Sequence, residues 1–156
     1  MDREVGIEVH DAMLARPSGP WAASAKPVGM EITFAASGIV VRDLDVAQRF
    51  YESVLGMKET NRVRVDSMGM DEVILAPPGG GGAIVLMRYD DGRSHVEVGQ
   101  KLVFAVPSPA AVADAAVSAG GKVLFPPTHL PDFGATIAFV QDPDGHSIEV
   151  LDRQVG

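Results

Sequence analysis

The sequence predicts an α+β fold built from two βαβββ units that follow one another in the chain. The first observation is that the order strand, helix, strand, strand, strand can be read twice along the sequence. The second is that the residues at the first strand end, the helix start and the helix stop recur 65 positions later: Val41, Asp43 and Gly56 become Val106, Ser108 and Gly121. The two units share little sequence identity, so the repeat lies in the order of elements and in these boundary residues.

In the first unit, residues 31–41 are apolar and extended, and a helix follows with Asp43 as its N-cap and Gly56 as its stop. The helix gathers its apolar side chains on one face, at Ala47, Phe50, Tyr51, Val54 and Leu55. Three strand-like runs come next, at 58–66, 70–77 and 82–89. The glycine-rich segment 77–82 joins the last two as a hairpin connection. It opens no helix and no Lys-Ser/Thr follows it, so it is not a phosphate-binding loop.

The second unit repeats this order. Residues 100–106 predict a strand, and the next helix has Ser108 as its N-cap and Pro109 at its first position. Strands are expected at 122–127, 135–141 and 146–152. The tetrapeptide DPDG, at 142–145, makes the turn between the last two strands.

These patterns also set the domain boundaries. Residues 1–30 are rich in Pro, Gly, Ala and Ser and show no sustained period, so we expect them to form an N-terminal arm. Residues 31–153 are expected to form a single domain, with one module at about 31–90 and a second at about 100–153.

Composition excludes several classes of function. With 13 basic and 21 acidic residues the net charge is −8, which argues against binding to nucleic acid or to anionic membranes. No apolar run approaches the roughly 20 residues that span a bilayer, and the charged start does not read as a signal peptide. The chain has no cysteine, which rules out disulfides, thiolate ligands and a cysteine nucleophile. A cytoplasmic protein is the expectation.

Two stretches carry a resemblance to a known family. VRDLDVAQRFYESVLGMKE, at 41–59, and IAFVQDPDGHSIEVLD, at 137–152, resemble two signatures of the vicinal oxygen chelate superfamily. This superfamily includes glyoxalase I, extradiol dioxygenases, fosfomycin-resistance proteins, methylmalonyl-CoA epimerase and bleomycin-resistance proteins. The resemblance implies two βαβββ modules that form a half-open mixed sheet around a concave pocket for a small molecule, usually in a homodimer.

The resemblance also implies where a metal would bind. Metal-using members resembling glyoxalase I place one ligand on each of four strands, and the matching positions here are Ala36, Leu86, Lys101 and Glu149. Alanine and leucine carry no donor atom, and a protonated lysine has no lone pair. A single carboxylate does not hold a catalytic divalent ion. We therefore expect a pocket without metal or other cofactor, in which Lys101 pairs with Glu149 where the ion would lie.

Strand alternation predicts which side chains line this pocket. They are Ala36, Gly38 and Val40, then Ile84, Leu86 and Arg88, then Lys101 and Val103, and finally Ser147, Glu149 and Leu151. The small residues leave room for a partly apolar ligand. Arg88 is a candidate clamp for a substrate carboxylate, while Lys101 and Glu149 are the candidate catalytic acid and base. His146 is expected to point away from the pocket.

Three classes of function stay open. The first is a protein that binds and sequesters a small organic molecule. The second is an enzyme that acts on one as a metal-independent lyase, isomerase or hydrolase; its alternative is a divalent-metal-dependent lyase, isomerase or dioxygenase of the glyoxalase type, with a rearranged ligand set of His95, His129 and Glu149. The third class is an interaction module with a vestigial pocket, which the small residues Ala36 and Gly38 argue against.

Overall fold

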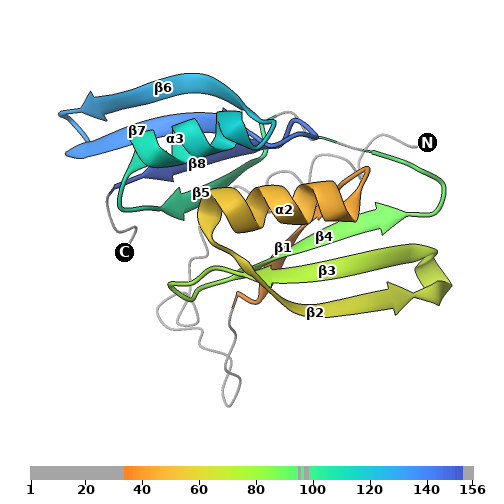
Figure 1. Cartoon of the computed structure of the whole chain (residues 1–156). Helices are drawn as coiled ribbons and strands as arrows, with labels where there is room; N and C mark the ends of the chain where they lie inside the picture. The colour runs from red at the N-terminus through yellow and green to blue at the C-terminus, as the bar shows by residue number, and fades with distance from the viewer. Residues whose placement is uncertain (1–33, 95, 97–98, 153–156) are drawn as a thin grey trace, which may run out of the picture. The chain divides into compact units, whose positions relative to one another are not determined.

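The computed structural model describes residues 34–94, 96 and 99–152. The arm predicted at 1–30 and the candidate ligand His95 lie outside these residues. The described chain belongs to one compact unit with two four-stranded mixed sheets, each accompanied by one helix (Figure 1). The predicted α+β fold of two βαβββ modules is therefore confirmed. None of the helices in the described residues is long and apolar enough to cross a membrane.

The first module forms a sheet that we call sheet A. Its strands lie in the order β1-β4-β3-β2, with β1 parallel to β4 and the other neighbours antiparallel. The elements of this module are β1 (Ala36–Val40), α2 (Leu44–Leu55), β2 (Lys58–Val65), the short 3-10 helix η2 (Asp66–Met68), β3 (Met70–Ala76) and β4 (Ala83–Tyr89).

The second module forms sheet B with the same topology. Its strands lie in the order β5-β8-β7-β6, and β5 is parallel to β8. The elements are β5 (Lys101–Ala105), α3 (Pro109–Ser118), β6 (Lys122–Leu130), β7 (Ala135–Gln141) and β8 (Ser147–Leu151).

The predicted helix boundaries have clear local causes. The Asp43 side chain accepts a hydrogen bond from the Val46 amide at 2.9 Å, and Gly56 ends α2 in the left-handed region at φ 65°. Gly121 serves a different purpose from its counterpart. A Cβ at this position would lie 2.3 Å from the Gln141 carbonyl oxygen, so only glycine allows this close approach to β7.

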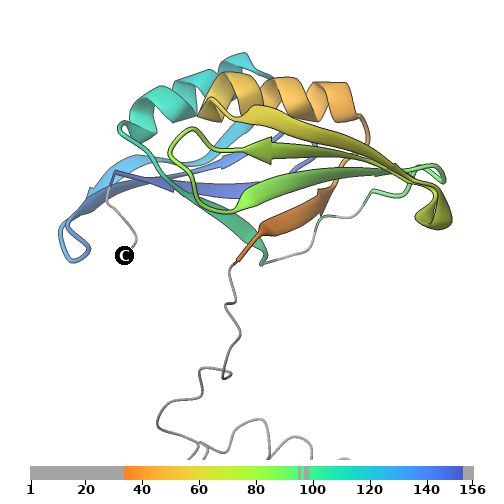
Figure 2. The ribbon, with the colours of Figure 1, turned by 90° about the horizontal axis from the view of Figure 1, so that it is seen from below.

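The helices α2 and α3 lie side by side over the same face of the two sheets (Figures 1 and 2). Their apolar faces and the sheet residues beneath them form one continuous core that spans both modules. Its fully buried members include Phe50, Tyr51, Val73, Leu86, Val140, Ile148 and Val150. The single core explains why the two modules form one folding unit.

Strand β6 is longer than predicted. The sequence suggested an end at Pro127, but the strand continues to Leu130, and His129, expected in a loop, pairs with Thr136. Pro126 and Pro127 fall within an irregularity of the ladder on an edge strand, where the missing backbone N–H groups cost little.

A buried carboxylate connects the two modules. Asp142 is 3% exposed, and one of its oxygens, Oδ2, accepts a hydrogen bond from the Tyr51 hydroxyl at 2.9 Å and contacts His146 Nδ1 at 2.7 Å. The other oxygen, Oδ1, accepts the backbone amides of Asp144, Gly145 and His146 at 2.8–3.0 Å. Asp142 therefore fixes the DPDG turn and fastens it to α2.

His146 has the opposite parity from Glu149 on β8, as expected, but the sequence did not indicate that it is buried: it is 6% exposed beside Asp142. Burial lowers the pKa of His146, but the hydrogen bond and charge of Asp142 outweigh it and raise that pKa above its ordinary value. For Asp142 burial raises the pKa, but the bonds from His146 and Tyr51 bring it below the ordinary value. Burial and the Asp142 charge raise the pKa of Tyr51, so its hydroxyl stays protonated and donates.

Replacing Asp142 with alanine should strongly destabilise the protein. The substitution leaves the Tyr51 hydroxyl, the His146 imidazole and the amides of Asp144 and His146 without their acceptor, and we expect the free energy of unfolding in urea to fall by about 3–5 kcal/mol. The control is Arg93→Ala, which removes an ion pair to Asp91 in which both side chains are more than half exposed, at 59% and 53%. That change should have little effect on the free energy of unfolding. Equal effects of the two substitutions would contradict the role given to Asp142.

The His146–Asp142 pair also predicts a pH dependence. The raised pKa of His146 contributes stability below its unfolded value of about 6.5, and this contribution is lost as the pH rises through the folded value. The lowered pKa of Asp142 contributes stability that is lost as the pH falls below about 4. The free energy of unfolding should decline above pH 6.5, and less steeply in His146→Asn. His129→Gln, at an exposed histidine, should leave the profile of the native protein unchanged.

Candidate functional site

The face of each sheet turned away from the helices is called its open face. On β1, Ile39 is buried beneath the helices, so Ala36, Gly38 and Val40 alternate onto the open face, as strand alternation predicted. Ladder pairing carries this assignment to neighbouring strands, because directly paired residues share a face.

Strand β4 presents the opposite set of residues from the one predicted. Gly38 pairs with Val85 and Ile39 pairs with Leu86, so Leu86 joins the core at 0% exposure while Val85 and Met87 occupy the open face. A Cβ at Gly38 would lie 2.9 Å from the Met87 terminal methyl carbon. The room expected beside Gly38 is therefore partly filled, and Leu86 does not line a pocket on this face.

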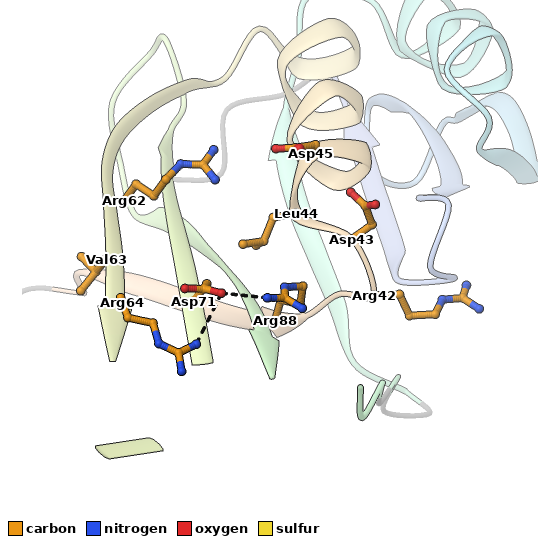
Figure 3. A pocket seen from close by; sticks show the side chains of 9 residues that line it. All are labelled: Arg42, Asp43, Leu44, Asp45, Arg62, Val63, Arg64, Asp71 and Arg88. Carbon is orange, nitrogen blue, oxygen red and sulfur yellow. Dashed lines mark hydrogen bonds and ion pairs between the residues drawn. The ribbon is translucent and has the colours of Figure 1, made fainter. Parts of the chain in front are cut away.

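Arg88 also lies on the helix-facing side. It borders a cavity of about 560 Å³ between the start of α2 and strands β2, β3 and β4 (Figure 3). Its Nη2 donates to Asp71 Oδ2 at 2.9 Å, and the same oxygen lies 3.5 Å from Arg64 Nη1. Each of the four arginines that line the cavity has a carboxylate partner. The positive charges that line the cavity are thus paired with carboxylates. Arg88 lies on the helix-facing side of sheet A and does not reach the open face, contrary to the prediction.

The open face of sheet B brings several predicted residues together. One row across its four strands consists of Val103, Glu149, Phe139 and Phe125. The next row contains Lys101, Ser147, Gln141 and Lys122. Val103 and Phe125 remain 46% and 38% exposed, so the row is an apolar surface open to solvent on which Glu149 is the charged member.

Lys101 and Glu149 form the central polar contact of this face. Lys101 Nζ donates to Glu149 Oε2, and the ammonium lies 5.4 Å from the centroid of the Phe139 ring. The lysine side chain is 48% exposed, whereas the glutamate is only 13% exposed. The mostly buried carboxylate of Glu149 is therefore paired with the ammonium of Lys101, and that ammonium is accessible to solvent.

A cavity of about 300 Å³ adjoins this pair along the edge of β5. It takes Lys101 and Val103 from sheet B and Ser37 and Ala83 from sheet A, so both modules contribute. The remaining lining is largely apolar: Phe34, Gly82, Ile84, Leu102 and Phe104. A volume of this size suits a small organic molecule. Phe34 and Phe104 were not anticipated, because the sequence does not reveal that the edges of β1 and β5 approach one another.

The residues present do not fit a metal centre of the glyoxalase type. The four positions matched through the resemblance carry Ala36, Leu86, Lys101 and Glu149, and Val85, which takes the place of Leu86 on the open face, adds no ligand atom, so the set supplies one oxygen donor group and no imidazole. Within the described part of the chain, no three His, Cys, Asp or Glu side chains are grouped so that they could hold an ion. Of the alternative ligand set, the two members that the structure describes, His129 and Glu149, lie on opposite faces of sheet B. His129 pairs with Thr136 and so takes the opposite face from Phe139 and Glu149.

Comparison with known proteins supports the fold and the sequence signatures. The model of the Glyoxalase/Bleomycin resistance protein/Dioxygenase superfamily matches residues 32–150. A protein of Vibrio parahaemolyticus named probable lactoylglutathione lyase is 31% identical over 121 residues, covering 73% of this chain and 86% of that protein. A Synechocystis protein of the same name is 31% identical over 120 residues, covering 72% and 89%.

Solved structures agree. A glyoxalase/bleomycin resistance protein/dioxygenase domain from Frankia superposes with a TM-score of 0.66 at 26% identity, over 80% of this chain and 100% of that domain. Glyoxalase I from Zea mays gives a TM-score of 0.66 at 26% identity over 78% of this chain, which spans only 44% of the maize chain. The chain thus belongs to the glyoxalase/bleomycin resistance protein/dioxygenase superfamily, the vicinal oxygen chelate family that its two signature stretches resemble.

Proposed function

We propose that the protein binds a small, partly apolar organic molecule, without a metal ion, on the open face of sheet B around Lys101, which also borders the cavity along the edge of β5. The observation that carries this proposal is the Lys101–Glu149 ion pair, which lies at two of the four positions where metal-using relatives place ligands. The ammonium supplies a fixed positive charge there, and Val103 and Phe125 supply exposed apolar surface.

The chemistry of the pair suits binding or proton transfer. An ammonium has three donors, of which one meets Glu149, so two can reach a ligand oxygen. A carbonyl held by these donors would be polarised, and the adjacent carboxylate could accept a proton from the neighbouring carbon. In this proposal Lys101 is the electrophilic group and Glu149 the base of a lyase or isomerase, if turnover accompanies binding.

A second candidate function is a metal-dependent lyase acting on lactoylglutathione. Relatives named probable lactoylglutathione lyase, with 31% identity over most of their length, favour it. The donor set described above opposes it, since Ala36 and Val85 carry no ligand atom. The two candidates differ in their need for a metal.

Metal analysis of the purified protein separates these candidates. We expect less than stoichiometric Ni, Zn, Mn or Fe, and no saturable thermal shift with these ions or Mg²⁺. A screen of carboxylate and carbonyl metabolites should instead raise the melting temperature through mass action. A stoichiometric metal whose binding is abolished by Glu149→Gln would establish the metal-dependent alternative.

The ion pair itself predicts a stability pattern. Lys101→Met leaves the mostly buried Glu149 carboxylate without its cation and should lower the free energy of unfolding by about 1–3 kcal/mol. Adding Glu149→Gln should recover most of that loss, because the neutral amide tolerates the apolar neighbour. Urea unfolding of the two single variants and the double variant measures this coupling. Strictly additive effects would show that the two side chains do not interact.

We also propose a homodimer located in the cytoplasm, in keeping with the family resemblance and the acidic composition. Light scattering coupled to gel filtration tests the dimer, which a monomeric mass at micromolar concentration would exclude.

A further inference from the structure

The row of side chains on the open face of sheet B limits which kinds of ligand can bind there. Val103, Glu149, Phe139 and Phe125 lie in register on four neighbouring strands, and with about 4.8 Å between strands the row is roughly 14 Å long. The Phe125 and Phe139 rings meet edge to face, with centroids 6.3 Å apart and an angle of 77° between their planes. The exposed Phe125 and its neighbour Phe139 favour an aromatic ligand, because aromatic rings prefer offset-stacked or edge-to-face contact with other rings.

The polar groups on this face restrict the ligand further. Lys101 Nζ lies over the Phe139 ring and donates to Glu149, which leaves it two hydrogens for which the described residues provide no acceptor. Ser147 follows Lys101 in the same row and offers a hydroxyl. A ligand group at this place therefore has to accept hydrogen bonds.

The charges exclude two other ligand classes. A charged ligand amine would lie beside the Lys101 ammonium and be repelled by it. If the amine instead displaced Lys101 from Glu149, the lysine would lose its carboxylate partner. A ligand with several anionic groups would meet one ammonium and the adjacent Glu149 carboxylate, on a chain whose net charge is −8. A single carboxylate or enolate oxygen matches the site.

We propose, building on the function proposed above, that the ligand is a flat aromatic or conjugated molecule with one acidic oxygen group. Its ring system lies against Phe125 and Phe139, and its carboxylate or enolate binds the Lys101 ammonium, which lies over the Phe139 ring. In this proposal Phe125 and Phe139 select for the aromatic ring system of the ligand, and Lys101 selects for its negative charge.

Calorimetry or NMR titration with four probes tests the proposal: 2-naphthoate, cyclohexanecarboxylate, 2-naphthylmethylamine and 2-naphthalenemethanol. We expect 2-naphthoate to bind most tightly. Lys101→Met should weaken its binding roughly tenfold or more, since a charge-assisted hydrogen bond is lost. Lys58→Met, at an exposed lysine of sheet A, should leave affinity unchanged.

The aromatic contacts are tested separately. Phe125→Leu and Phe139→Leu keep an apolar side chain, and each should weaken 2-naphthoate by about threefold to tenfold without changing cyclohexanecarboxylate. Phe125 is the more exposed of the two, so its variant keeps the test valid should Phe139→Leu unfold.

The possible outcomes separate this inference from the function on which it rests. Equal binding of the two carboxylates, insensitive to both phenylalanine variants, would overturn the aromatic ligand and keep the Lys101 site. Tighter binding of the amine than of 2-naphthoate would overturn the acidic group. Failure of all four probes, or binding that Lys101→Met leaves unchanged, would overturn the inference; a bound metal at Glu149 would in addition overturn the proposed function.

Discussion

The buried carboxylate of Asp142 is the constraint on which the arrangement of this protein depends. It accepts hydrogen bonds from a tyrosine of the first module and from the amides of the turn that starts β8. The turn is thereby fixed relative to α2, and β8 leaves it with Glu149 on the open face. A side chain that never touches the ligand face thus decides where the charged residue on that face lies. Its charge is tolerated in the core because every oxygen has donors.

The two modules share a topology but offer different open faces. In sheet A, Met87 covers Gly38, and the arginines lie on the helix-facing side in ion pairs. In sheet B the corresponding surface is apolar, open to solvent and crossed by one ion pair. Two modules of the same topology can carry different open faces because the shared core uses the helix-facing residues. Of the two open faces, that of sheet B has the features of a binding surface.

Much of the fold could be predicted because its signals are local. The N-caps Asp43 and Ser108 and the helix stop at Gly56 can be read within a few residues. The face of β4 could not be predicted, since Ala83 to Met87 are all apolar and show no alternation to separate core from open face. The burial of His146 was missed for another reason. Its partner Asp142 also accepts a hydrogen bond from Tyr51, which lies 91 positions earlier in the chain, and a single sequence gives no sign of that contact.

The site was predicted unevenly for the same reasons. Lys101 and Glu149 lie on short strands of alternating exposure, where counting from a turn or a cap works, and the structure brings them into contact. Arg88 and Leu86 depended on the face of β4 and lie on the other side of sheet A. The metal-free site is tested most directly by a crystal structure of the protein soaked in Ni²⁺, with anomalous scattering recorded at the nickel edge. We expect no anomalous peak at Glu149 and an unbroken contact between Lys101 Nζ and the Glu149 carboxylate. A peak bound by Glu149, with Lys101 turned away, would contradict a metal-free site.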